Sequence, residues 1–286
     1  MKRLFLAATL AAMMLVPASS ASAFTGEFAR FNTCPLSNAS VAFCLSAEST
    51  GGTFTVGKKT VPLVKQVNLR GGLIAPEGLA GPATFVAPTD GVVISKAAQP
   101  VPGGLTGVVA PAWWPKVLRD LFNETINNGF TGVTATVELA GSASAVKVSL
   151  TNYLFQSGAA FSLPVKVKLD NLFLGSSCYI GSNSNPVNLN LTSGTTAPPA
   201  PNKPISGNVG EGGNFEEEKI LFFKHNKLVD NSFAAPGANG CGGILFSWAV
   251  DPLVDSILGT PSPAGTNTAI LEGSTFLGVA SALRAM

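Results

Sequence analysis

The chain has 286 residues, of which 12% are charged, and it contains 31 glycines, 20 prolines and one histidine. The net charge is +2 for the whole chain and zero once Lys2 and Arg3 are set aside with the N-terminal segment discussed next. A neutral surface gives no electrostatic basis for binding nucleic acid or an anionic membrane. The glycine and proline content suits short strands joined by tight turns and excludes a helical bundle.

Residues 1–23 have the layout of a secretory signal peptide. Lys2 and Arg3 precede an apolar run from Leu4 to Val16, and small residues end the segment at Ala21-Ser22-Ala23. The run is short for a membrane helix, which needs about 20 residues, and no apolar stretch of spanning length follows it. We therefore predict cleavage after Ala23, no membrane span after cleavage, and one secreted β-rich domain over residues 24–286 in the extracellular space or cell envelope.

The first half of the mature chain predicts weak strands and then one helix. Strands are expected at residues 53–56, 61–69, 84–86 and 92–95, and a helix is expected over Pro115 to Asn127. The pair Trp113-Trp114 precedes this helix. Such a pair could dock a sterol, an acyl chain or a partner protein, but we expect it to pack into the core.

The second half carries the clearest strands, with apolar and polar residues in alternation over residues 133–139, 163–169 and 187–191. Residues 146–150 are expected to form a hairpin with 133–139 across Gly141 to Ser144. A proline-rich stretch over residues 197–204 is expected to be a long surface loop. Further strands are predicted at residues 220–223 and 268–271, and a second helix at Phe246 to Leu258, with Pro252 in its first turn.

Four cysteines remain in the mature chain, and an even number in an exported protein favours two disulfides. Pairing Cys34 with Cys44 and Cys178 with Cys241 is the simplest of the three arrangements, because it joins near neighbours in sequence. A zinc site is the rival interpretation, but the chain has no C-x-x-C pair and only one histidine. We expect no metal ion and no cofactor.

His225 is the sole candidate for a histidine general base. A serine hydrolase would need it beside a serine, with a carboxylate such as Asp230 or Asp170 to orient the ring. The alternative is an exposed histidine between two lysines, which we favour. The chain contains no G-x-S-x-G, H-E-x-x-H, P-loop or G-x-G-x-x-G motif, so its catalytic residues, if any, are unknown.

Several segments resemble a known group of proteins. They are Leu163 to Asn171, Leu174 to Ser182, Leu189 to Pro199 and Lys227 to Phe233. In these segments the chain is similar to a family of uncharacterised exported actinobacterial proteins, some of whose relatives are labelled cholesterol esterase-like. The resemblance is strongest over residues 162–243. It implies a secreted protein, and the label implies action on a lipid ester.

These observations predict a mainly β fold: an antiparallel β-sandwich or partly open barrel with two short amphipathic helices and two disulfides. The predicted role is that of a secreted extracellular or envelope protein that binds an apolar small molecule or lipid. The alternative is a lipid or sterol ester hydrolase that uses His225. A third reading, an outer-membrane protein with lipid-facing strands, is disfavoured because two tyrosines and a non-aromatic C-terminus supply no aromatic girdle.

Overall fold

The computed structural model describes residues 23–77, 81–127, 130–215, 217 and 219–286. The predicted signal peptide lies outside the described residues except for Ala23. The described chain is mainly β, with 37% of residues in strands and 20% in helices, so the predicted fold class is confirmed.

The strands are β1 (Phe43–Val56), β2 (Lys59–Pro62), β3 (Val67–Ile74), β4 (Ala83–Val86), β5 (Gln99–Pro100), β6 (Thr134–Leu139), β7 (Lys147–Val148), β8 (Phe161–Asp170), β9 (Tyr179–Ile180), β10 (Val187–Leu191), β11 (Glu211–Phe215), β12 (Ile220–Asp230), β13 (Ala238–Asn239) and β14 (Thr268–Val279). The helices are α1 (Lys116–Phe122), α2 (Leu150–Phe155), α3 (Gly243–Leu258) and α4 (Ala280–Arg284). Short 3₁₀ or π turns complete the regular structure: η1 (Gly26–Phe31), η3 (Gly104–Thr106), η4 (Asn123–Asn127) and η5 (Ala143–Ala145).

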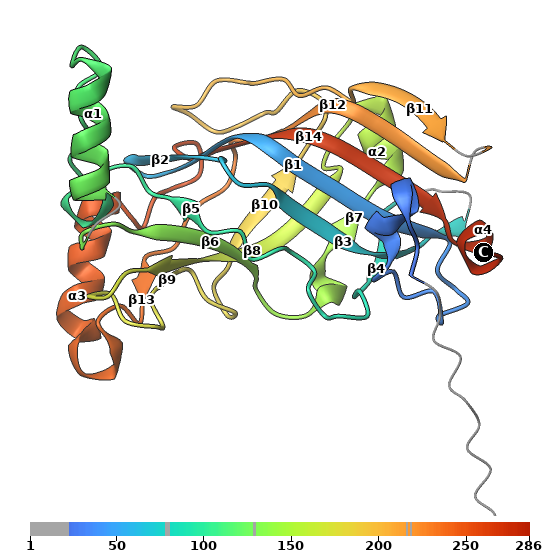
Figure 1. Ribbon diagram of the computed structural model, residues 1–286, viewed down its shortest axis with the longest axis horizontal. Helices are drawn as coiled ribbons and strands as arrows, with labels where there is room; N and C mark the ends of the chain where they lie inside the picture. Colours follow the sequence, from blue (N-terminus) through green and yellow to red (C-terminus); the bar gives the residue numbers. More distant parts are fainter. Residues whose placement is uncertain (1–22, 78–80, 128–129, 216, 218) are drawn as a thin grey trace, which may run out of the picture.

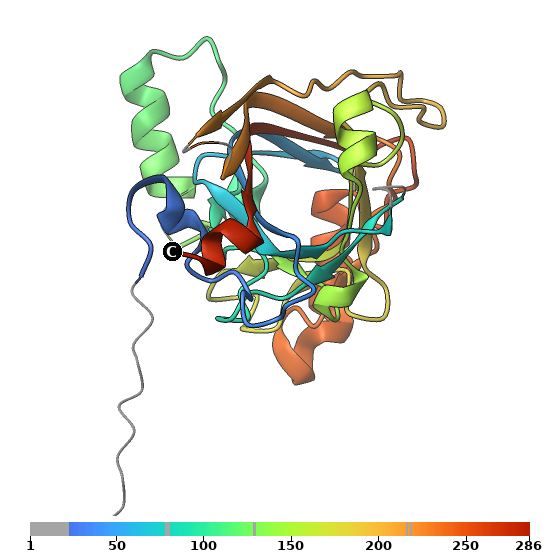
Figure 2. The same ribbon diagram turned by 90° about the vertical axis from the view of Figure 1, so that its right-hand side faces the viewer.

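All fourteen strands belong to one antiparallel sheet, whose main order is β11-β12-β14-β1-β3-β4-β7-β8-β6-β5. The sheet curls round on itself, as the end view in Figure 2 shows. It does not close into one continuous ladder among the described strands. Two backbone hydrogen bonds of 2.9 Å between Thr192 and Val229 nevertheless link the end of β10 to β12.

The inner face of the curled sheet is the buried, apolar face. Along β8 every second residue from Phe161 to Leu169 is buried, while the residues between them are half-exposed. The same alternation occurs in β10, where Val187, Leu189 and Leu191 are buried and the two asparagines between them are exposed. This is the pattern expected of an antiparallel sheet with one face on the core, and it is the pattern predicted from the sequence.

One predicted pairing is wrong. β6 and β7 do not form a hairpin across Gly141 to Ser144, because both strands pair with β8, and a 3₁₀ turn occupies residues 143–145. The strand expected to continue to Leu150 ends at Val148. Ser149 instead begins α2, and its hydroxyl accepts a hydrogen bond of 3.2 Å from the backbone N–H of Asn152.

The predicted helices form, with altered limits. α1 covers Lys116–Phe122 and continues as a π turn to Asn127. α3 begins at Gly243, three residues before the predicted start, so Pro252 lies inside the helix and not in its first turn as predicted. α2 and α4 are two further helices that the sequence pattern does not predict. No helix of the described residues is long and apolar enough to cross a membrane.

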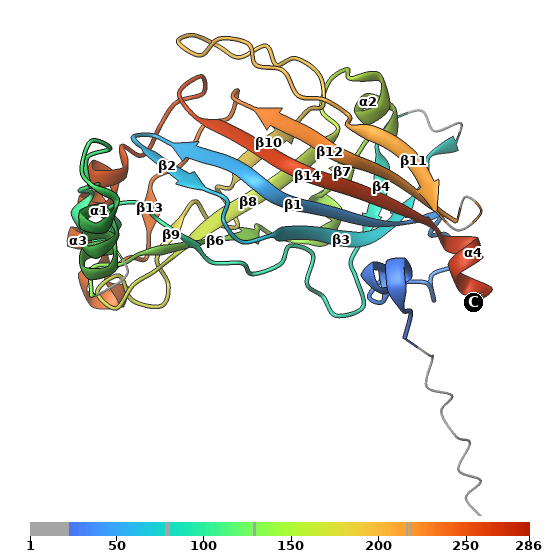
Figure 3. The same ribbon diagram turned by 45° about the horizontal axis from the view of Figure 1, so that its top comes forward.

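Two disulfides tie down opposite ends of the sheet. Cys34 pairs with Cys44 near α4, and Cys178 pairs with Cys241 immediately before α3, which is the pairing favoured by the sequence. α1 and α3 lie together at the end of the molecule opposite α4 (Figures 1 and 3). Two disulfides favour folding in an oxidising compartment.

Candidate functional site

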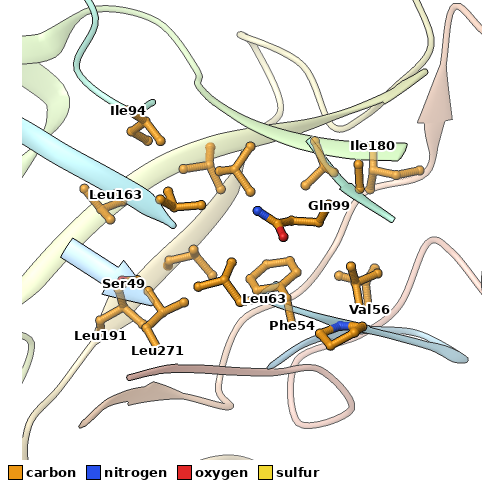
Figure 4. Close-up of a pocket in the computed structure, with 18 of the residues that line it drawn as sticks. Ser49, Phe54, Val56, Leu63, Ile94, Gln99, Leu163, Ile180, Leu191 and Leu271 are labelled. Carbon is orange, nitrogen blue, oxygen red and sulfur yellow. The ribbon is translucent and has the colours of Figure 1, made fainter. Parts of the chain in front are cut away.

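A cavity of about 150 Å³ lies inside the curled sheet. Its walls come from strands on every side of the sheet and from the last residue of α3 (Figure 4). Of the 26 residues that line it, only Ser49, Lys59 and Gln99 are polar. The apolar remainder are Ala47, Phe54, Val56, Val61, Pro62, Leu63, Val67, Leu69, Ile94, Val101, Ala135, Val137, Phe161, Leu163, Val165, Val167, Leu169, Ile180, Leu189, Leu191, Leu228, Leu258 and Leu271.

The wall of the cavity runs along β8. β8 contributes five consecutive inward residues, from Phe161 to Leu169, to its wall. At a rise of about 3.3 Å per residue, these positions span about 26 Å. The residues that line the cavity therefore extend along most of β8.

The two ends of the cavity differ in exposure. Ile94, Phe161 and Leu191 at one end are buried. Phe54 and Val56, on the opposite side of Figure 4 from Ile94 and Leu191, are half-buried, although Ile180 on that side is buried. We infer that the end at Phe54 and Val56, beside the backbone hydrogen bond from Lys58 to Leu258 of α3, is the mouth of the cavity.

Gln99 is one of the three polar residues that line the cavity, and both atoms of its side-chain amide form hydrogen bonds within the protein. Its Oε1 accepts hydrogen bonds of 2.9 Å from the backbone N–H groups of Val64 and Lys65. Its Nε2 donates to the carbonyl oxygens of Lys65 and Ala97, at 2.8 and 3.2 Å. Gln99 therefore holds the chain between β2 and β3 in place, and its own amide adds no unpaired polar group to the cavity.

Among the described residues that line the cavity, Lys59 is the only charged one, and we place it at the mouth. Its Nζ donates a hydrogen bond of 3.1 Å to the carbonyl oxygen of Gly107, and no ion pair of the described residues includes it. The ammonium retains two further donors for a second partner. An anionic group at the mouth could take that place.

α3 closes the mouth on one side. Leu258 lines the cavity, and Val254 and Val250, one and two turns earlier, pack on the core cluster that contains Cys178 and Cys241. Asp251 accepts hydrogen bonds from the backbone N–H groups of Gly240 and Cys241, at 3.2 and 2.7 Å.

A second aspartate completes this anchoring, since Asp255 accepts a bond of 2.7 Å from the N–H of Ala238. The disulfide and these carboxylates together fix α3 against β13 and β9.

The structure does not bring the predicted catalytic residues together. His225 sits in a bulge of β12 at φ +57° with its ring 78% exposed, and its Nδ1 lies 3.7 Å from a carboxylate oxygen of Glu211. It is not among the residues that line the cavity. No hydrogen bond within the described chain joins it to a serine. The exposed location that we favoured for His225 is the one observed.

The two candidate carboxylates lie elsewhere. Asp170 pairs with Lys168 at 2.6 Å. Asp230 is buried, and five residues of β12 place it about 16 Å from His225. Burial raises the pKa of the Asp230 carboxyl, and hydrogen bonds from the backbone N–H groups of Asn190 and Ser232, at 2.6 and 2.8 Å, oppose the rise. Asp230 is thus a structural link between β10 and β12.

The tryptophan pair departs from the prediction. Trp114 is half-buried and packs edge-on against Phe122, with ring centroids 5.8 Å apart, but Trp113 is 81% exposed. The expectation that both tryptophans join the core is therefore wrong for Trp113. Within the described residues, no cluster of three His, Cys, Asp or Glu side chains could hold a metal ion.

Comparison of the chain with protein-family models, with curated proteins and with solved structures finds no match.

Proposed function

We propose that the protein is secreted and binds a lipid that has a single extended alkyl chain, with an acidic head group at Lys59. The cavity carries this proposal. Apolar cavities of this size stay dry and accept small apolar guests, and burial of an alkyl chain contributes about 0.8 kcal/mol for each CH₂ group. The lining extends for about 26 Å along β8, which suits an extended alkyl chain.

The predicted signal peptide and the two disulfides support export, and the segments quoted above resemble the exported actinobacterial family. The alternative of an ester hydrolase has weaker support. His225 lies outside the cavity, in an exposed bulge whose nearest ionic partner is Glu211. A substrate in the cavity would be out of reach of its imidazole.

Calorimetric titration of the oxidised mature protein with dodecanoate tests the proposal. We expect saturable binding at one site, no turnover of a nitrophenyl ester, and the same affinity in His225→Ala. Absence of saturable dodecanoate binding would contradict the proposal that the protein binds a lipid. Ester hydrolysis that disappears in His225→Ala while circular dichroism is unchanged would establish the hydrolase instead.

A further inference from the structure

Exposed apolar side chains are concentrated at the α1–α3 end of the molecule. Fourteen of the eighteen large apolar residues exposed in the described chain belong to α3, α1 with its flanking segments, or the turn after β8. We name this region the apolar end surface. Its members include Trp113, Leu121, Phe173, Ile244, Phe246 and Trp248, each more than half exposed. Contiguous exposed apolar groups of this kind mark an interaction site.

The members of this surface are held next to one another. Phe173 packs edge-on against Phe130, with ring centroids 4.9 Å apart, and Asn171 donates a hydrogen bond of 2.7 Å to the carbonyl oxygen of Gly132. The turn that carries Phe173 also meets the start of α3, where the N–H of Gly242 donates to the carbonyl oxygen of Leu174 at 2.7 Å. This turn therefore joins the segment after α1 to α3.

α3 is apolar on both of its faces. The inward face packs on the core through Val250, Val254 and Leu258, while Ile244, at 99% exposed, points into solvent. Its only charged residues, Asp251 and Asp255, are turned toward the backbone of β13 and its following turn. A helix that is apolar on all sides is normally buried in a protein core or in a membrane. We therefore expect the outward face of α3 to be covered by a lipid or protein surface.

The composition of the surface fits a lipid phase. All three tryptophans of the chain, Trp113, Trp114 and Trp248, lie at this end. Tryptophan is enriched where a protein meets the head-group region of a bilayer, and helices that lie in that region insert Trp, Phe and Leu side chains.

Lysines flank this surface where α3 ends. Lys58 Nζ donates to the carbonyl oxygen of Ser256 at 3.3 Å, and Lys59 reaches Gly107 beside it. Neither lysine belongs to an ion pair of the described residues. Although the mature chain is neutral overall, these two ammonium groups place local positive charge where lipid head groups would lie.

We propose that the apolar end surface docks on a lipid bilayer, with α1 and α3 lying in its interface and the mouth of the cavity facing it. The choice of a bilayer over a protein partner rests on the proposed function. An alkyl chain leaves a membrane most readily where the cavity mouth meets it, and Leu258 and Lys59 belong to that mouth.

Vesicle flotation tests the docking with the oxidised mature protein and two kinds of vesicle: pure phosphatidylcholine, and equal parts of phosphatidylcholine and phosphatidylglycerol. We expect flotation with both, a preference for the second, and a blue shift of tryptophan emission. The double variant Ile244→Ser/Phe246→Ser keeps all three tryptophans and should bind vesicles about 10-fold more weakly or worse. The matched control Leu154→Ser/Phe155→Ser removes exposed apolar side chains from α2 and should bind like the unmodified protein.

Titration with dodecanoate in the absence of vesicles separates this proposal from the proposed function. The Ile244→Ser/Phe246→Ser variant should retain dodecanoate affinity, because neither side chain lines the cavity. Failure of the unmodified protein to float with either vesicle, or equal flotation of both double variants, would overturn the docking and leave cavity binding intact. A dimer that Ile244→Ser/Phe246→Ser dissociates, without vesicle binding by the unmodified protein, would assign the surface to self-association instead.

Discussion

Filling the cavity from Ala135 should stabilise the fold while it removes ligand binding. Ala135 is a buried residue of β6 whose side chain lines the cavity. Ala135→Leu adds three carbon groups, which contribute up to about 2.4 kcal/mol if all are buried in space that is now empty. Ordering the leucine side chain costs about 0.5 to 1 kcal/mol, so we expect the free energy of unfolding to rise by about 1 to 2 kcal/mol.

The assay pairs urea unfolding with calorimetric titration of dodecanoate. A gain of stability together with loss of binding excludes unfolding as the cause of the loss. The control is Ala280→Leu, since Ala280 is fully buried in the cluster around Phe31 and does not line the cavity. There the added atoms have no empty space, so we expect a loss of about 1 to 3 kcal/mol with dodecanoate affinity retained.

Two results would refute this reasoning. Destabilisation of Ala135→Leu to the same extent as Ala280→Leu would show that the cavity is not empty space. Stabilisation of Ala135→Leu with unchanged dodecanoate affinity would show that the ligand binds elsewhere.

The remaining predictions concern the mouth, the second disulfide and a buried carboxyl. Lys59→Met should weaken dodecanoate binding about 10-fold but leave dodecanol binding unchanged, because only dodecanoate carries a charge. The control Lys58→Met changes the neighbouring lysine, which lies outside the cavity wall, and should affect the binding of neither ligand. An equal loss of affinity for both ligands in Lys59→Met would contradict a charge-based role. Replacing Cys178 and Cys241 with alanine opens a loop of 63 residues and should lower the free energy of unfolding, measured by chemical denaturation, by about 4 kcal/mol. A loss below about 1 kcal/mol would show that the disulfide does not constrain the unfolded chain. The raised pKa of Asp230 means that the folded protein binds this proton more readily than the unfolded chain. Its contribution to stability is therefore complete below pH 3.8, the ordinary value, and is lost as the pH rises through the raised pKa. The stability of the protein relative to Asp230→Asn should then fall from acid to neutral pH in a urea series, and a difference that grows with pH would reverse the sign of the shift.

The strands could be predicted where one face of the strand is buried and the other is exposed to solvent. β8 and β10 show this pattern over their whole length, so their positions follow from hydrophobic periodicity. Periodicity does not specify the partner strand. β6 and β7 are close in sequence and have the pattern of a hairpin, yet both pair with β8, because the curl of the whole sheet decides which edges meet.

The helices show a related limit. Apolar residues in α1 and α3 predict helices with an apolar face, but the sequence does not say whether that face is covered. Trp113 was therefore expected in the core, although it is exposed. α3 starts early because Gly242 and Gly243 adopt positive φ values of 78° and 70° at the disulfide, a constraint that depends on a cysteine distant in sequence.

The cavity could be anticipated only as a class of site. High hydrophobicity and low charge indicated an apolar ligand, but empty space arises from side chains of many strands that fail to fill the interior. Lys59 and Gln99 carry no sequence signal that separates them from other lysines and glutamines. Their roles follow from location: one at the mouth, the other bound to the backbone of residues 64, 65 and 97.

Nuclear magnetic resonance of the mature protein with ¹³C-labelled dodecanoate tests the central claim most directly. Intermolecular nuclear Overhauser effects should join the alkyl chain to methyl groups of Val165, Leu189 and Leu271, which line the cavity from three different strands. No such effect should reach Leu154 on the exposed face of α2. Contacts confined to surface methyl groups, or no contact at saturating ligand, would contradict binding inside the sheet.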